Sequence, residues 1–460
     1  MTLDSQDPVP AEPQDPQSNA DERTGLLFSV NVVFLSQIAI YGLAFGLRVV
    51  LARALGDDGL GTYSLFFVAV LVAGGVANLG VGLGNIYFLN KGEHSYEELL
   101  SGSLFVLGAS SVLTWVLLFA FGLTTDTNLF VSGRSYWLYG AALPAVVGYV
   151  LLTSFLHGSS RFPALSAVAV FQGITGLAIV GAMYAADELD VFWALAGWAA
   201  SFLLADALAL AFIGLHRVDL AAVLRPRWGV LREQIRYGAQ GQIANLAQLF
   251  NYRLDQFLVA AFVSRAGVGH YTVAVGLSES VWWLSSSVAL VLMPRLTEMD
   301  PERATEMTPL ACRSTLLASI LAAVALIIIS PLAIDILFGD EFSPTQWPLI
   351  LLMPGIIAAS ATRVLGSYLF SQGRIIYNTY ATFIALGLTI ALDFALIPTL
   401  EVEGAAIASS IAYTASLLAT LYWYRRVSGG SIAEALLFRP SDLRYYAEAW
   451  ERVRERLPFL

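Results

Sequence analysis

Charged side chains inside long apolar stretches are the residues of this chain best placed to do chemistry. Taking a charge out of water is costly, so such a residue is expected to face a cavity, a partner charge or a path open to water. The set comprises Arg48, Asp206, Arg253, Asp255, Glu279, Asp335, Arg363 and Asp393. We discount Asp335 and Asp393, because they fall near the ends of their stretches, where they can reach water.

Two of the stretches carry a polar stripe. At about 100° per residue, Gln37, Tyr41 and Arg48 fall within roughly 40° of one another on a helix over 28–50. A helix over 238–262 has a broader stripe, about 160° wide. It consists of Gln242, Asn245, Gln248, Tyr252, Arg253, Asp255 and Gln256. Neither polar face is compatible with contact to lipid, so both are predicted to face one shared, water-accessible space.

Arginines around such a space suit an anion, because a guanidinium can hold phosphate oxygens in a bidentate way. We predict that a phosphate or pyrophosphate head group binds Arg48, Arg253, Arg363, Gln37, Tyr41, Asn245 and Gln248. Asp255, Glu279 and Asp206 are candidates for binding a proton or Na⁺ that drives the cycle. The alternative is structural pairing, for example of Arg253 with Glu279 or Asp206, with no ligand.

The sequence pattern contains no recognisable set of catalytic residues. The longest connection on the predicted outer side, near 124–135, is too short to gather a nucleophile, a base and an oxyanion donor. No phosphate-cradling glycine loop is present, and the four histidines and one cysteine are scattered. We therefore expect a transporter and not an enzyme, without a metal, a cofactor or a nucleic-acid partner.

The elements that must position these residues are twelve apolar stretches, each long enough to cross a hydrocarbon core of about 30 Å as a helix. They run near 28–50, 62–83, 102–123, 136–156, 164–184, 192–215, 238–262, 270–293, 312–332, 347–370, 376–397 and 404–424. The composition agrees, since 57% of residues are hydrophobic and only 13% are charged, against about 25% charged in a soluble domain. The sequence predicts an all-α membrane protein.

Basic residues fix the predicted orientation. With the amino terminus in the cytoplasm, 19 Lys and Arg residues fall on the inner side and 3 on the outer side. Only an even number of helices with both termini cytoplasmic keeps this asymmetry, which membrane proteins commonly show. We expect a multi-pass protein of the cell membrane that contacts membrane lipids.

The two halves of the chain repeat each other. Gly59-Leu60-Gly61-Thr62-Tyr63 aligns with Gly267-Val268-Gly269-His270-Tyr271 at a shift of 208 residues, and Arg161 aligns with Arg374 at a shift of 213. Six helices per repeat keep the copies parallel, related by an axis along the membrane normal.

Five segments follow from these patterns. We predict a disordered cytoplasmic leader at 1–24 and six-helix bundles at 25–215 and 238–427. Between the bundles, 216–237 is predicted to be a cytoplasmic amphipathic linker, and 428–460 a cytoplasmic amphipathic tail.

Three motifs resemble the polysaccharide biosynthesis (oligosaccharide flippase) proteins, of the superfamily that includes multidrug and toxin extruders. The first is the run from Arg53 through Gly59-Leu60-Gly61-Thr62-Tyr63 to Ser64. Tyr252-Arg253-Leu254-Asp255-Gln256 is similar to the family's charged motif, and Ile397-Pro398 with Glu403-Gly404-Ala405 to the start of its last helix. The likeness covers about residues 25–427. Arg53, Arg253 and Asp255 match family positions.

The resemblance implies two bundles that rock about a central cavity and move a polyprenyl-linked oligosaccharide to the outer leaflet. Glycosyltransferases of the same pathway are implied partners. A drug exporter of the extruder branch and a non-transport scaffold for glycan assembly stay open as alternatives. The glycan, the carrier, the coupling ion, the resting state and the oligomeric state are not specified by the sequence.

Overall fold

The computed structural model describes residues 16–124, 133–214, 226–439 and 442. Every regular element in these ranges is helical. The long helices are α1 (Pro16–Ala77), α2 (Val81–Lys91), α3 (Tyr96–Thr124), α4 (Tyr139–Gly158), α5 (Phe162–Ala185), α6 (Val191–Ile213), α8 (Trp228–Phe262), α9 (Arg265–Glu298), α10 (Pro301–Leu337), α11 (Gln346–Ser371) and α12 (Ile376–Ser428). Shorter pieces are η1 (Gly133–Leu138), η3 (Asp340–Thr345) and α13 (Ile432–Leu436).

The predicted twelve membrane crossings are accounted for within the described residues. Nine segments are long and apolar enough to span a membrane. Two of them fold back on themselves, α1 at Gly56 and α12 at Glu401, where φ is 68° and 51°. Glycine adopts such a φ without strain. The twelfth crossing is α8, whose polar stripe keeps its hydropathy below that of the other spans.

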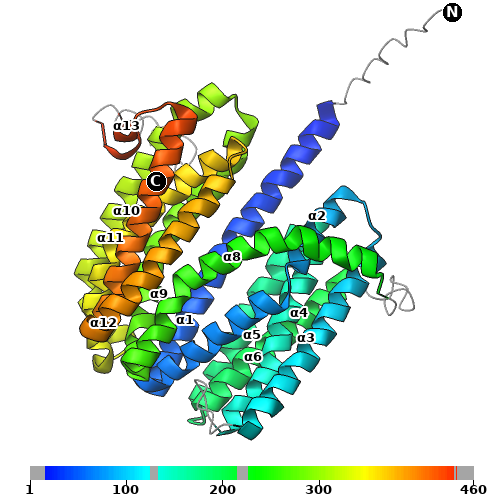
Figure 1. The fold of residues 1–460 in the computed structure, drawn as a ribbon, viewed down its shortest axis with the longest axis vertical. Helices are drawn as coiled ribbons and strands as arrows, with labels where there is room; N and C mark the ends of the chain where they lie inside the picture. The colour runs from blue at the N-terminus through cyan, green and yellow to red at the C-terminus, as the bar shows by residue number, and fades with distance from the viewer. Residues whose placement is uncertain (1–15, 125–132, 215–225, 440–441, 443–460) are drawn as a thin grey trace, which may run out of the picture.

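The helices form two bundles, α1–α6 and α8–α12 (Figure 1). The bundles converge where α1 folds back, which we call the Gly56 end. They diverge toward the opposite end, where α1 begins and α12 finishes, which we call the terminal end. The expected layout of two six-helix repeats is therefore present.

Helix α8 joins the two bundles. Its first turns pack on the first bundle, where Gln234 Nε2 donates to Asn85 Oδ1 (2.6 Å) and to the Leu99 carbonyl (3.2 Å). The backbones of Gly80 and Gly238 touch there, since a Cβ on Gly238 would lie 1.8 Å from the Gly80 oxygen. Further along, α8 packs against α9 and α12 of the second bundle.

Helix boundaries differ from the predicted segments in three places. Residues 228–237 of the predicted linker are the first turns of α8, and 16–24 of the predicted leader belong to α1. In the tail, 432–436 form α13, while the amphipathic pattern expected after 442 lies outside the described residues.

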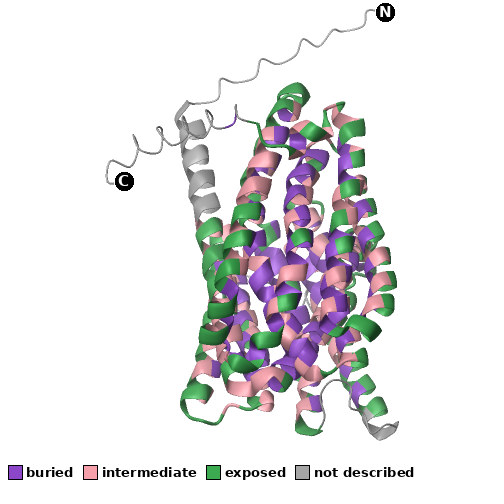
Figure 2. Ribbon diagram, turned by 90° about the vertical axis from the view of Figure 1, so that its left-hand side faces the viewer, coloured by how far each residue is buried: buried purple, intermediate pink, exposed green. Residues whose placement is uncertain are grey.

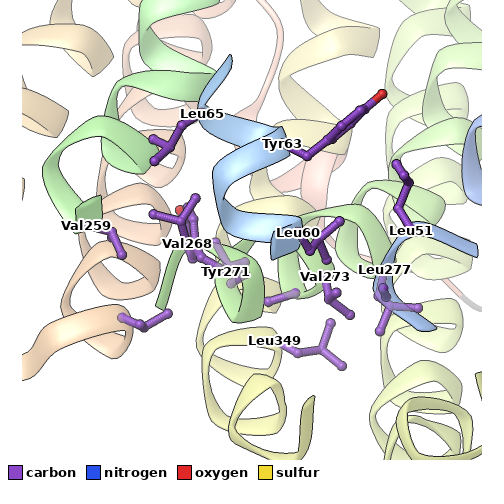
Figure 3. Close-up of a cluster of buried hydrophobic side chains, with 14 of the residues drawn as sticks. Leu51, Leu60, Tyr63, Leu65, Val259, Val268, Tyr271, Val273, Leu277 and Leu349 are labelled. Atoms are coloured by element: carbon purple, nitrogen blue, oxygen red, sulfur yellow. The ribbon is translucent and has the colours of Figure 1, made fainter. Parts of the chain in front are cut away.

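Buried residues concentrate in the middle of the molecule, and exposed ones cover the outward faces of the helices (Figure 2). One apolar cluster connects both bundles at the Gly56 end (Figure 3). Leu60 from α1 meets Val268 and Tyr271 from α9 there, with Val259 from α8 and Leu349 from α11. The bundles thus share this core at the Gly56 end, whereas at the terminal end only the first turns of α8, among the described residues, pack into an apolar cluster of the first bundle.

Candidate functional site

Arg253 on α8 and Glu279 on α9 form an ion pair near the middle of these helices. Arg253 Nη2 donates to Glu279 Oε1 at 3.0 Å, and both side chains keep about a fifth of their surface accessible. One of the two structural pairings considered for Arg253 is therefore present.

Arg48 reaches the same place from α1. Its guanidinium lies against Gly276, where a Cβ would sit 1.6 Å from Arg48 Nη1. Gly276 precedes Glu279 by three residues, so the two lie on one face of α9. Arg48 consequently interacts electrostatically with both Glu279 and Arg253. A glycine at 276 is what lets an arginine from the first bundle approach the second bundle's ion pair.

Arg363 on α11 contributes a third guanidinium. It stacks on the Trp282 ring, with Cζ 4.1 Å from the ring centroid, and Nη1 donates to Ser286 Oγ at 2.7 Å. Its Nε is buried without a hydrogen-bond partner. Such an unsatisfied donor is available to an incoming acceptor.

We call Arg48, Arg253 and Arg363 the central arginines. Two cavities flank the stretch of α8 that carries Arg253. One, of about 300 Å³, is lined by Arg48 and Arg253 and by groups from α1, α5 and α6. The other, of about 480 Å³, lies within the second bundle and is lined by Arg363, Trp282 and Gln248. The region holds three guanidinium groups against two carboxylates, since Arg253 pairs with Glu279 and also interacts electrostatically with Asp255, so positive charge is in excess.

The other predicted head-group residues are arranged less tightly. Tyr41 stacks on Trp283 with ring centroids 4.6 Å apart. Gln248 lines the larger cavity and accepts a hydrogen bond from Thr382 at 3.1 Å. Gln37 and Asn245 are exposed and line neither cavity.

The three acids predicted to couple an ion do not come together. Glu279 pairs with Arg253, whereas Asp255 is buried in the second bundle, where it accepts bonds from Tyr271 Oη and from Ser409 Oγ at 3.2 Å. Asp206 lies against Gly148 on α4, inside the first bundle.

Asp393 was discounted as reaching water, and the structure contradicts this. Its side chain has no exposed surface, and neither carboxylate oxygen has a hydrogen-bond partner. It interacts electrostatically with Asp255. One turn earlier on α12, Thr389 donates a hydrogen bond to Asn251 at 2.9 Å. The helical spacing of Thr389 and Asp393, which puts both on one face, was a signal in the sequence.

The repeated glycine motifs meet at the Gly56 end. A Cβ on Gly61 would lie 1.8 Å from the Arg265 oxygen, and one on Gly269 would lie 2.1 Å from the Asp57 oxygen. His270 Nε2 is 3.2 Å from Asp57 Oδ2. These contacts hold the bundles together, so the motif copies form an interface with each other, a role that sequence reasoning missed.

Arg53 adds a further lock across this interface. Its Nε donates to the Leu337 carbonyl at 3.0 Å, and its Nη2 reaches the carbonyls of Asp335 (3.3 Å) and Ile336. These are the last carbonyls of α10, and a cation is favourable at a helix C-terminus. We call this set of contacts between the bundles the end lock.

Solved structures of transporters share this fold. The structure of lipid II flippase MurJ in an inward closed conformation matches with a TM-score of 0.70 at 14% identity, over 87% of this chain and 90% of that one. An inward-facing multidrug resistance MATE transporter of the MOP superfamily matches with a TM-score of 0.61 at 15% identity, over 85% and 94%.

Sequence comparison points the same way. The chain is 21% identical to the probable low-salt glycan biosynthesis flippase Agl15 of Haloferax volcanii over 390 residues, which is 83% of this chain and 79% of that protein. The family described as polysaccharide biosynthesis protein matches residues 26–300, well over half of the chain. On this match the chain belongs to the polysaccharide biosynthesis protein family.

Proposed function

We propose that the protein is a flippase that moves a polyprenyl-(pyro)phosphate-linked oligosaccharide across the cytoplasmic membrane by alternating access. The observation that carries the proposal is the set of central arginines, with Arg48 and Arg253 close to Glu279 where the bundles meet and Arg363 in the adjoining cavity of the second bundle. A sugar phosphate cannot cross hydrocarbon unaided, and arginines held in cavities can replace water around its phosphate oxygens. The flippase relatives support the same class of substrate.

Orientation follows from the distribution of basic residues, which favours the cytoplasm for the terminal end. The end lock then lies at the outer face, and the bundles diverge toward the cytoplasm. In this state the central arginines would receive a head group from the inner leaflet. Breaking the end lock while the bundles close at the terminal end would present the head group outside, by rigid-body motion around a fixed site.

Ion coupling in this proposal belongs to Asp255 together with Asp393. Two buried carboxylates that interact electrostatically favour uptake of a proton or a cation, which lowers their repulsion. Binding of a proton or a cation to this pair would favour one arrangement of α8 and α12. Because α8 also carries Arg253, ion binding would be linked to the head-group site.

A drug exporter of the extruder branch is the second candidate, favoured by the shared fold alone. Central arginines repel the organic cations that an acidic, aromatic cavity would attract. A scaffold for glycan assembly, with glycosyltransferases as partners, would need no cavity charge.

Deletion of the gene in its host tests the proposal. Mass spectrometry of lipid-linked glycans should find the loaded carrier accumulating while surface glycan falls. Wild-type protein and Arg374→Ala, an exposed arginine on the connection after α11, should rescue, whereas Arg253→Ala should not, at equal expression. Unchanged glycan pools in the deletion strain would overturn the proposal. Rescue by Arg253→Ala would favour the scaffold function, which needs no cavity charge.

A further inference from the structure

An apolar groove of about 1170 Å³ lies on the first bundle, apart from the central arginines. Its walls are the second half of α1, with Ala73, and α3, with Ala109 and Leu113, while the start of α8 closes one end. The hydroxyls in the α3 wall are satisfied within that helix, Ser110 donating to the Leu107 carbonyl (3.0 Å) and Thr114 to the Ser110 carbonyl (2.7 Å). An occupant therefore meets an apolar surface.

Two cations stand at the α8 end of the groove. Arg232 and Arg236 line it, are exposed, and form no ion pair within the described residues. Neighbouring acids are engaged elsewhere, since Glu233 lies 2.8 Å from His94 and Glu98 pairs with Arg227. The groove is thus complementary to a molecule with a long apolar chain and an anionic head.

The length of the groove selects among such molecules. Its α3 wall runs from Phe105 to Phe121, which is about 24 Å at 1.5 Å per residue. One leaflet supplies about half of a 30 Å hydrocarbon core, or about 15 Å. A phospholipid acyl chain confined to its own leaflet would leave the far part of the groove unfilled, whereas a longer chain would fill it.

We propose that this groove binds the polyprenyl chain of the phosphate-linked carrier, with the carrier phosphate on Arg232 and Arg236. This inference rests on the proposed function and adds a lipid site to it. The site lies at the cytoplasmic end of α8, the helix that carries Arg253 further along. It holds the carrier at the cytoplasmic side, from which the phosphate-linked head group passes to the central arginines.

Binding of a glycan-free probe tests the site separately from transport. Full-length protein in nanodiscs of zwitterionic phospholipid would be titrated with a long-chain polyprenyl phosphate. We expect at least about tenfold weaker binding for Ala73→Trp with Ala109→Trp, which fills the groove, and for Arg232→Gln with Arg236→Gln, which removes the cations. Val112→Trp, exposed on α3 beside the groove, and Arg374→Gln should bind as wild type.

The competitors and variants separate the outcomes. Farnesyl phosphate should bind at least about tenfold more weakly than the long-chain probe, because it cannot fill the groove. Equal competition by phosphatidylglycerol would make the groove an ordinary phospholipid site and overturn the inference. Wild-type affinity in both double variants would also overturn the inference. The proposed function would still stand in that case if Arg253→Ala failed to rescue glycan export. If wild-type protein bound no polyprenyl phosphate, both would fail.

Discussion

Replacing Gly61 by alanine is expected to open the end lock. The new methyl group would lie 1.8 Å from the Arg265 carbonyl oxygen, whereas an ordinary contact at a Cβ is 3.4 Å or more, so the two backbones must separate by about 1.6 Å. Both surfaces are helix backbone, so no rotamer change relieves the clash. Overpacking of this kind costs about 1–3 kcal/mol. A cost of 2 kcal/mol shifts the equilibrium between closed and open lock about 30-fold.

The assay is an electron paramagnetic resonance distance measurement between spin labels on Glu188→Cys and Thr399→Cys, exposed positions in the two bundles at the Gly56 end, in a Cys312→Ala background. Gly61→Ala should move most of the population to longer distances. Gly42→Ala serves as the matched control, because a Cβ there meets nothing within 4 Å. Alanine favours a helix over glycine by about 1 kcal/mol, so neither variant should lose helix content. A wild-type distance distribution in Gly61→Ala would refute the role given to the glycine motifs.

Three further predictions follow from particular side chains. Arg363→Lys keeps the charge but loses the planar stacking on Trp282 and the fork geometry, so affinity for a polyprenyl diphosphate head group should fall about tenfold by titration. Asp255→Asn combined with Asp393→Asn should remove the dependence of transport on a proton or Na⁺ gradient in proteoliposomes, and unchanged dependence would place coupling elsewhere. Arg313 binds Asp442 through two contacts of 2.6 Å and holds the pKa of that carboxyl below its usual value. A lowered folded pKa gives stability that is present above the unfolded pKa of about 4 and is lost as pH falls through the folded value. Asp442→Asn should therefore speed amide exchange in α13 at pH 7 but not at the acid end of this window.

The membrane-crossing helices and their division into two repeats were predictable from the sequence, because the length of an apolar stretch and the placement of basic residues are local signals. Arg48 and Arg253 were expected to look onto one shared space from two helices. The structure brings them together at Gly276, whose role depends on a contact between the bundles. No local sequence pattern indicates a contact between two bundles. The same reason explains why the meeting of Gly61 with Arg265 was missed.

Buried acids were harder to place. Asp393 lies near the end of its apolar stretch, which suggested access to water, but it is fully buried, and its helix packs against α8. Asp206 sits well inside its stretch yet faces α4 within one bundle. Distance from a helix end does not determine exposure in a protein whose helices also cover one another. The first turns of α8 were read as a linker because their arginines are typical of a membrane surface, and Gln234 instead anchors them to the first bundle.

The main claim is that the central arginines carry the phosphate of a lipid-linked glycan across the membrane. Its most direct test is purified protein in proteoliposomes that contain a fluorescent polyprenyl-diphosphate oligosaccharide, with the head group's exposure to an impermeant quencher followed in time. We predict that wild-type protein and Arg374→Ala move the head group between leaflets, and that Arg253→Ala moves it at no more than about a tenth of that rate. Equal rates for Arg253→Ala and wild type, or no movement by wild type, would contradict the account.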